Sequence, residues 1–257
     1  MNQIQYQSGA IDPGGCISSA WELVKGKFGL YLGAGLVVML LIGCVPVVAW
    51  FMFGPVMGGF YYIGLRDMRG EPVDFGMLFK GFDKFVPLML AGLIQQVPGI
   101  ILTIIQYTVD IARLVGIQGP ADVNFYQPSS DILASITGAV VAIVIGLALF
   151  SIIWTLALSF AIPLLVENNI GLGEALLTSV KAASSNPGGL IVLVILEVLV
   201  AVLGVIALCV GIFVAIPVIY LANVMAYRQV FPYLGPVNVY TGPPPPEYYG
   251  GSFGRSD

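Results

Sequence analysis

A single carboxylate, Glu197, lies inside an apolar run of membrane length. Between Ala182 and Tyr227 the chain holds no other charged side chain. A charge at the centre of a membrane helix costs on the order of 3 kcal/mol by insertion scales, so such a residue usually faces a cavity, a partner or a proton. Two roles suit Glu197: a proton- or cation-binding site, or a protonated side chain that hydrogen-bonds between helices. Because no Lys, Arg or His lies nearby in this run to pair with it, the structural role is favoured.

Two amides lie in the middle of another uncharged run, Phe85–Val109. Gln95 and Gln96 shortly precede Pro98-Gly99. A proline here frees a backbone carbonyl and kinks the helix, and an amide side chain is able to satisfy that carbonyl. Gln95, Gln96 and Glu197 therefore form a candidate intramembrane polar site, although hydrogen bonding between packed helices is the simpler explanation of the glutamines.

The sequence contains no recognisable catalytic set. It has no histidine, which removes the commonest general base and the commonest metal ligand. No Ser or Cys has a base to activate it, no Gly-rich loop leads to a Lys, and no carboxylate pair is spaced for two metals. We therefore expect no enzymatic activity, no cofactor and no bound metal.

The elements that must position these residues are membrane helices. Hydrophobic residues make up 58% of the chain, charged residues 9%, and the mean hydropathy is +0.95, which excludes an ordinary soluble domain. Roughly 20 helical residues cross the hydrocarbon core. The runs Phe28–Leu65 and Ala182–Tyr227 are long enough for two crossings each, and Phe85–Val109 and Ile132–Val166 for one each. The sequence thus predicts an all-α transmembrane bundle of about six spans, because open strands leave backbone groups unpaired in lipid. Turns are expected at Gly43, Pro46 or Gly54-Pro55, and near Gly204–Gly211.

The basic residues predict an orientation. Of the ten Lys and Arg residues, six spans place nine on one side of the membrane and only Arg113 on the other. By the positive-inside rule that side is cytoplasmic, so both termini are expected inside and the Gln106–Asp131 loop outside. The opening segment has no basic region of a signal peptide. The predicted location is the cell membrane, which the chain crosses several times.

Short amphipathic helices are predicted before three of the crossings, beginning at Pro13, Asp74 and Leu172. The second carries an apolar stripe of Phe75, Leu78, Phe79, Phe82 and Phe85. Such helices suit the bilayer interface, and packing on the cytoplasmic ends of the bundle explains them equally well.

A repeat accompanies these helices. At an offset of 160 residues, Ser19 matches Ser179, and Gly29-Leu30 matches Gly189-Leu190. The pattern indicates up to three units of a surface helix followed by a transmembrane hairpin.

Three regions follow along the chain. Residues 1–12 are predicted to form a polar N-terminal tail and residues 13–231 the membrane domain. Residues 232–257 are rich in Pro, Gly and Tyr and are predicted to form a disordered cytoplasmic tail. Pro245-Pro246-Glu247-Tyr248 also matches the ligand of WW domains, which leaves a peptide-binding role open.

Several short motifs occur in a characteristic order. They are Arg69-Gly70-Glu71, Phe75-Gly76-x-Leu78-Phe79-x-Gly81-Phe82, Pro163-Leu164-Leu165-Val166, Glu174-Ala175-Leu176-x-x-Ser179, Val210-Gly211-x-Phe213-Val214-x-Ile216-Pro217 and Ala226-Tyr227-Arg228. The ordered set resembles a family of uncharacterised bacterial multi-pass membrane proteins related to the membrane domain of glycerophosphodiester phosphodiesterases. The resemblance implies a six-helix integral protein of the bacterial inner membrane, and it offers no established catalytic residues to carry over.

Three classes of function remain, of which an enzyme is the least supported. The first is a non-enzymatic membrane-organising, assembly or interaction protein, with membrane lipids as partners and no nucleic acid. A protein partner or a second copy is expected to pack on the glycine-rich faces Gly29-x-x-x-Gly33 and Gly54-x-x-x-Gly58. The second is a small-molecule or ion transporter that uses Glu197 as an intramembrane proton or cation site. A polar cavity that reaches Glu197 would favour the second function.

Overall fold

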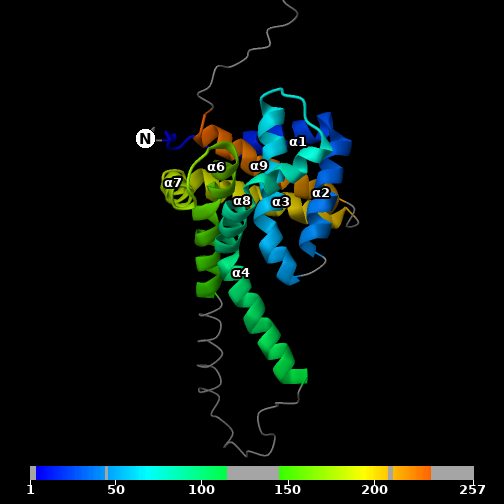
Figure 1. Ribbon diagram of the computed structural model, residues 1–257, viewed down its shortest axis with the longest axis vertical. Coiled ribbons are helices and arrows are strands. Elements are labelled where there is room, and N and C mark those ends of the chain that lie inside the picture. Colours follow the sequence, from blue (N-terminus) through cyan, green and yellow to red (C-terminus); the bar gives the residue numbers. More distant parts are fainter. Residues whose placement is uncertain (1–3, 44–45, 115–144, 208–210, 233–257) are drawn as a thin grey trace, which may run out of the picture.

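The computed structural model describes residues 4–43, 46–114, 145–207 and 211–232, and within these ranges it contains helices and no strand. In chain order the elements are α1 (Pro13–Gly26), α2 (Phe28–Gly43), α3 (Pro46–Met68), the 3₁₀ helix η1 (Phe75–Lys84), α4 (Phe85–Leu114), a helix over residues 145–158, α6 (Ala161–Glu167), α7 (Leu172–Ser184), α8 (Pro187–Ile206) and α9 (Ile212–Val230). The predicted all-α helical bundle is confirmed (Figure 1).

Several helices begin where the sequence supplies a start signal. Asp12 caps α1, because its Oδ1 accepts from the backbone N–H of Gly15 at 3.1 Å and Pro13 occupies the first turn. Pro187 likewise occupies the first turn of α8. The two predicted turns are also confirmed: α2 ends at Gly43 before α3 begins at Pro46, and the α8–α9 turn lies between Ile206 and Ile212. Pro55 does not end a helix but lies inside α3.

Within the described ranges, five helices are long and apolar enough to span a membrane: Val48–Met68, Phe75–Thr108, Ile145–Glu167, Pro187–Ile206 and Ile212–Val230. The number rises to six if α1 and α2 are counted as one span, although they meet at an angle of 106°. The chain is therefore a multi-pass membrane protein, in agreement with about six predicted spans.

Helix α3 lies at the centre of the bundle and contacts α2, η1, α4, α6 and α9. Glycine makes this possible, because a Cβ at Gly54 would lie 1.8 Å from the Leu88 carbonyl oxygen of α4. Gly58 faces the Leu88 side chain. The Gly54–Gly58 face predicted for a partner is thus covered by α4 of the same chain, whereas a Cβ at Gly29 would meet nothing within 4 Å.

The second amphipathic helix differs from the prediction in its geometry. Residues 75–84 form a 3₁₀ helix whose face of Leu78 and Gly81 is buried. A Cβ at Gly59 would lie 1.6 Å from the Leu78 carbonyl oxygen, so η1 and α3 touch backbone to backbone. Phe79 and Phe82 lie on another side, 51% exposed and partly buried respectively. The single predicted stripe is therefore divided, because side chains three residues apart eclipse in a 3₁₀ helix.

The structure describes residues 4–12 of the predicted N-terminal tail but only residue 232 of the predicted C-terminal tail. Residues 4–12, within the predicted polar tail, are held against the last helices (Figure 1). Their hydrogen bonds are Gln7 N to Val230 O, Gly9 N to Ser185 O, Ala10 N to Asn186 Oδ1 and Asp12 N to Gln229 Oε1. Residues 233–257, with the predicted tail and its Pro-Pro-Glu-Tyr motif, lie outside the described residues, as does most of the Gln106–Asp131 loop.

Candidate functional site

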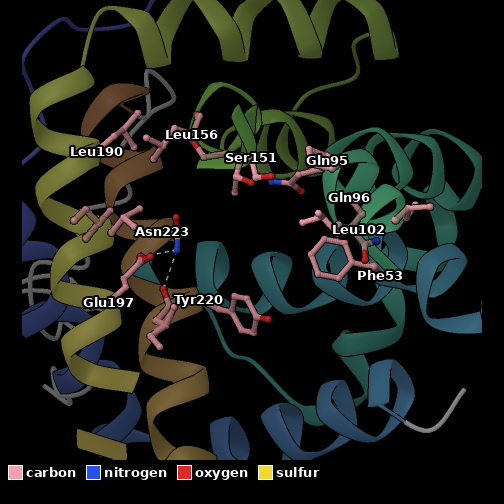
Figure 2. A pocket seen from close by; sticks show the side chains of 18 of the residues that line it. Phe53, Gln95, Gln96, Leu102, Ser151, Leu156, Leu190, Glu197, Tyr220 and Asn223 are labelled. Atoms are coloured by element: carbon pink, nitrogen blue, oxygen red, sulfur yellow. Dashed lines mark hydrogen bonds between the residues drawn. The ribbon is translucent and has the colours of Figure 1, made fainter. Parts of the chain in front are cut away.

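A cavity of about 550 Å³ lies between α3, α4, the helix over residues 145–158, α8 and α9. Glu197, Gln95 and Gln96 all line it, although α4 and α8 are far apart in the sequence. Figure 2 shows Glu197, Asn223 and Tyr220 on one side and Gln95, Gln96 and Phe53 on the other. The fold thus brings the three predicted polar residues to one hollow.

Glu197 has a defined partner. It lies in the middle of α8, partly buried, and its Oε1 accepts from Asn223 Nδ2 of α9 at 2.7 Å. The same amide nitrogen donates to the Ile219 carbonyl at 3.1 Å, which fixes the side chain of Asn223 to its own helix. Among the described residues, only Asn223 donates to this carboxyl group. One oxygen is therefore oriented by protein, and the other can accept a proton or a ligand.

Sequence reasoning missed Asn223, although a signal for it exists. Glu197 precedes and Asn223 follows the α8–α9 turn by equal distances, since both are 13 residues from position 210. In an antiparallel hairpin, residues equidistant from the turn lie opposite one another. Gly204 and Ala215, which are 6 and 5 residues from the same position, also lie next to one another.

The proline in α4 frees a carbonyl, as predicted, but a different side chain satisfies it. Pro98 has no N–H, so the carbonyl of Ile94 loses its helical donor. The indole Nε1 of Trp154 donates to that carbonyl at 2.8 Å. The prediction of an amide donor was therefore wrong.

The two glutamines instead donate to other carbonyls. Gln95 Nε2 donates to the Leu158 carbonyl at 3.4 Å, and Gln96 Nε2 to those of Gly92 and Trp50 at 3.3 and 3.5 Å. The Oε1 of Gln95 is buried and has no hydrogen-bond partner among the described residues. An acceptor that lacks a donor in a buried place is costly, so this oxygen is a candidate ligand contact.

The rest of the lining combines aliphatic side chains with hydroxyl groups and aromatic rings. The serine and threonine residues are Thr103, Ser151, Thr155 and Ser159, and the aromatic residues are Trp50, Phe53, Tyr61 and Tyr220. No Lys or Arg belongs to the described lining. The described lining thus offers hydrogen-bond acceptors and a carboxyl group but no cationic side chain. Such a lining suits a ligand that donates hydrogen bonds or carries a positive charge.

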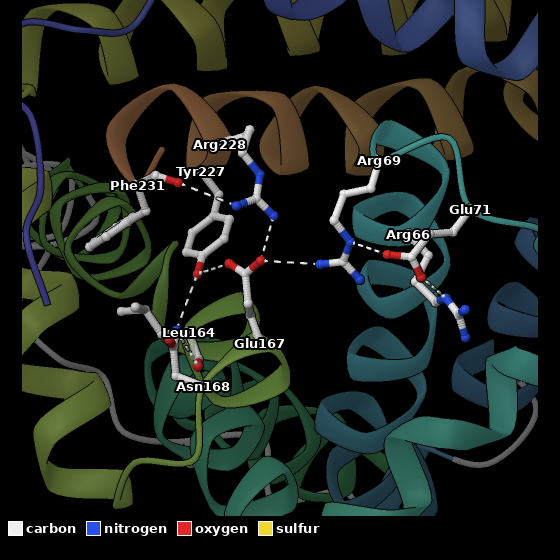
Figure 3. Close-up of polar contacts among 9 residues, drawn as sticks. All are labelled: Arg66, Arg69, Glu71, Leu164, Glu167, Asn168, Tyr227, Arg228 and Phe231. Carbon is white, nitrogen blue, oxygen red and sulfur yellow. Dashed lines mark hydrogen bonds and ion pairs between the residues drawn. The ribbon is translucent and has the colours of Figure 1, made fainter. Parts of the chain in front are cut away.

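A second polar cluster, which sequence reasoning missed, joins α3, α6 and α9 (Figure 3). The Oε1 of Glu167 accepts from Arg228 Nη2 at 2.6 Å and from Arg69 Nη1 at 3.4 Å, and Oε2 accepts from the hydroxyl of Tyr227 at 2.8 Å. Glu71 continues the cluster by pairing with Arg69 and Arg66 at 2.5 and 2.6 Å. Arg69, Glu71, Tyr227 and Arg228 belong to the ordered motifs, but Glu167 does not, so the motifs alone did not reveal their shared partner.

The electrostatics of Glu71 follow from this cluster. The hydrogen bond from Arg69, with a further contribution from Arg66, lowers the pKa of the Glu71 carboxyl below its ordinary value. A lowered pKa in the folded state means that folding favours the ionised carboxylate. Its contribution to stability is therefore complete above the ordinary pKa and is lost as the pH falls through the lowered one.

No family model matches the chain, and neither the curated proteins nor the solved structures contain a match. The resemblance to membrane domains of glycerophosphodiester phosphodiesterases stays a prediction.

Proposed function

We propose that this protein binds a small solute in the cavity within its helix bundle and transports it, with Glu197 as the proton- or cation-binding side chain. The observation that carries the proposal is the convergence of Glu197, Gln95 and Gln96 on one cavity of about 550 Å³. Small-molecule sites typically enclose about 300–1,000 Å³ and place a few polar groups in an apolar lining. Ionisable residues within membrane spans usually face a substrate or ion pathway.

The Glu197–Asn223 pair supports a binding role over a purely structural one. A glutamate that only held helices together would need no cavity beside it. Here one carboxyl oxygen is 2.7 Å from Asn223 Nδ2, and the residue also lines the cavity. Uptake of a proton or a cation at the second oxygen would reduce the cost of the charge and couple it to solute binding.

A membrane-organising function is the second candidate, and exposed aromatic residues of η1 favour it. Phe75 and Phe79 are 41% and 51% exposed, and the rings of Phe79 and Phe82 lie 6.2 Å apart. Aromatic rings on a short surface helix suit the headgroup level of a bilayer or a neighbouring protein. This function needs the outer surface of the bundle and does not need the cavity.

Cysteine accessibility tests the proposal without knowledge of the solute. The native cysteines Cys16, Cys44 and Cys209 are first replaced by Ala. In this background, Ser151→Cys places a thiol in the cavity. Leu149→Cys is the control, because residue 149 is on the same helix, is 56% exposed and does not line the cavity. We expect a trimethylammonium methanethiosulfonate to modify residue 151 faster than a sulfonate-bearing one by about tenfold or more, because a carboxylate-lined cavity concentrates cations. Adding Glu197→Gln should remove that preference.

The same variants connect accessibility to function. Glu197→Gln should accumulate in the membrane like the wild type yet fail to restore a deletion strain, whereas the exposed control Glu174→Gln should restore it. No modification at residue 151, together with full restoration by Glu197→Gln and failure of Phe79→Ser, would reject transport and favour membrane organisation.

We also infer that the protein lies in the bacterial inner membrane with both termini in the cytoplasm. The nine-to-one division of basic residues supports this orientation. Reporter domains fused at Gly119 and Gly250 should report opposite sides of the membrane, with Gly250 inside. Reporters on one common side would contradict the six-span arrangement.

A further inference from the structure

A second hollow adjoins the cavity of Glu197 and differs from it in chemistry. It encloses about 320 Å³ between the helix over residues 145–158, α7 and the start of α8. Its lining is Ile153, Leu156, Ala157, Val180, Ala183, Ser184, Pro187, Leu190 and Ile191. Apart from Ser184, every described residue of this lining is apolar, so we call it the apolar groove.

Two leucines divide the apolar groove from the polar cavity. Leu156 and Leu190 line both hollows, and Figure 2 shows their side chains next to one another at the edge of the polar cavity. Each leucine side chain therefore lies between the polar cavity and the apolar groove. Leu156 is partly buried and Leu190 is 2% exposed, so a change of rotamer in either leucine requires the neighbouring side chains to move with it.

The apolar groove is also open to lipid. Ile153, Val180 and Ile191 are 66%, 42% and 49% exposed at the bundle surface. In a membrane-spanning chain, large exposed apolar side chains contact acyl chains. A molecule with a hydrocarbon chain could therefore enter from the bilayer and keep that chain in an apolar environment throughout.

The polar cavity selects the other end of such a molecule. It offers the carboxyl group of Glu197, the buried Oε1 of Gln95 without a donor, and four aromatic residues, and its described lining holds no Lys or Arg. A protonated amine supplies a hydrogen-bond donor to either of these oxygens and a positive charge that aromatic faces attract. An anionic headgroup would have no Lys or Arg side chain of the described lining to pair with.

We propose that the solute is a single-chain amphiphile with a protonated amine as its head, bound with the amine in the polar cavity and the hydrocarbon chain in the apolar groove. This inference rests on the proposed function and names the substrate class of the same site. The two leucines would then separate to admit the junction between head and chain.

Protection of the cavity thiol tests this inference. The Ser151→Cys protein in liposomes is modified by the cationic reagent in the presence of propylamine, dodecylamine or dodecanoate. Dodecylamine should protect at a concentration lower than propylamine by about tenfold or more, because each methylene buried contributes about 0.8 kcal/mol. Dodecanoate should not protect.

A matched pair of variants separates groove binding from accumulation of dodecylamine in the bilayer. Val180→Trp fills the apolar groove, whereas Leu177→Trp adds the same ring to the same helix at a position that is 64% exposed and outside the groove lining. The advantage of dodecylamine over propylamine should vanish in Val180→Trp and persist in Leu177→Trp, while protection by propylamine should be equal in both.

The possible results lead to different conclusions. If the advantage of dodecylamine over propylamine is lost in both Trp variants or persists in both, the hydrocarbon chain does not bind in the apolar groove. Protection by dodecanoate would contradict selection of an amine as the head. In both cases protection by propylamine would leave the proposed transport function standing. Failure of every amine to protect a reactive thiol would overturn the substrate class alone, whereas a thiol that no reagent reaches would overturn the transport function as well.

Discussion

At the scale of single residues, one hydrogen bond repairs the defect that Pro98 introduces into α4. The Trp154 indole donates to the Ile94 carbonyl, which the missing N–H of Pro98 leaves without a helical partner. The bond also ties α4 to the helix over residues 145–158, next to Gln95. It therefore helps to hold the polar cavity in shape.

A double-mutant cycle measures this repair. Trp154→Phe should lower the free energy of unfolding by about 1–2 kcal/mol, because it leaves the Ile94 carbonyl unsatisfied. In a Pro98→Ala background, the restored N–H of residue 98 serves that carbonyl, so the same change should cost less by about 1 kcal/mol. Unfolding in mixed detergent micelles gives the four free energies.

Trp21→Phe is the control, since Trp21 lies on α1 and is 42% exposed. It should have little effect in either background. Equal costs of Trp154→Phe with and without Pro98 would show that the indole acts only through packing.

The residues of the site differed in how readily the sequence revealed them. Glu197 and the two glutamines are conspicuous because a charge or an amide inside an apolar run has an energetic cost that composition alone makes visible. The donor to the Ile94 carbonyl is 60 residues away, and its choice depends on how two helices are rotated against each other. That rotation is a property of packing, which no local pattern encodes.

At the scale of elements, α3 approaches its neighbours more closely than ordinary side chains allow. The ideal Cβ positions of Gly54 and Gly59 fall 1.8 and 1.6 Å from carbonyl oxygens of α4 and η1. The sequence predicts the apolar helices and the turns near Gly43–Pro46 and Gly204–Gly211, although Pro55, the other predicted turn position, lies inside α3. The pairing partner and the 3₁₀ geometry of η1 could not be predicted, because both follow from backbone contacts with α3.

A pair of glycine substitutions tests the close crossing of α3 and α4. Gly54→Ala should destabilise the protein by about 2–4 kcal/mol, because relief of the clash with the Leu88 carbonyl requires the helices to separate. Gly29→Ala meets nothing within 4 Å and should be neutral or stabilising by up to about 1 kcal/mol, since alanine favours the helix. Thermal unfolding in detergent compares them.

Separation of α3 and α4 would also widen the cavity between Gln96 and Trp50. The thiol of Ser151→Cys should therefore react faster in the Gly54→Ala background. An unchanged melting temperature for Gly54→Ala would contradict the backbone contact.

At the scale of the whole molecule, Glu167 connects parts of the chain that are far apart in the sequence. Its carboxylate serves Arg69 at the end of α3 and Tyr227 and Arg228 at the end of α9, and it is 16% exposed. Glu167→Gln should lower the free energy of unfolding by about 1–3 kcal/mol, because two guanidinium groups lose a shared carboxylate. Glu174→Gln, at an exposed position of α7, should change it by less than about 0.5 kcal/mol.

Detergent unfolding of the purified variants would make this comparison. Adding the second substitution Arg228→Gln to Glu167→Gln should recover part of the lost free energy of unfolding, since it removes one of the two guanidinium groups that Glu167 paired with. If the two glutamate variants are equally stable, the cluster is not a structural connection.

The contacts of residues 4–12 impose an order in time on the assembly of the protein. This segment is synthesised before its hydrogen-bond partners, which are 176 to 223 residues later in the chain. Closure of so long a loop cannot precede synthesis of α9. Residues 4–12 therefore reach their final place only after α9 has been made, and a polypeptide released before Val230 would leave this segment without its partner on that helix.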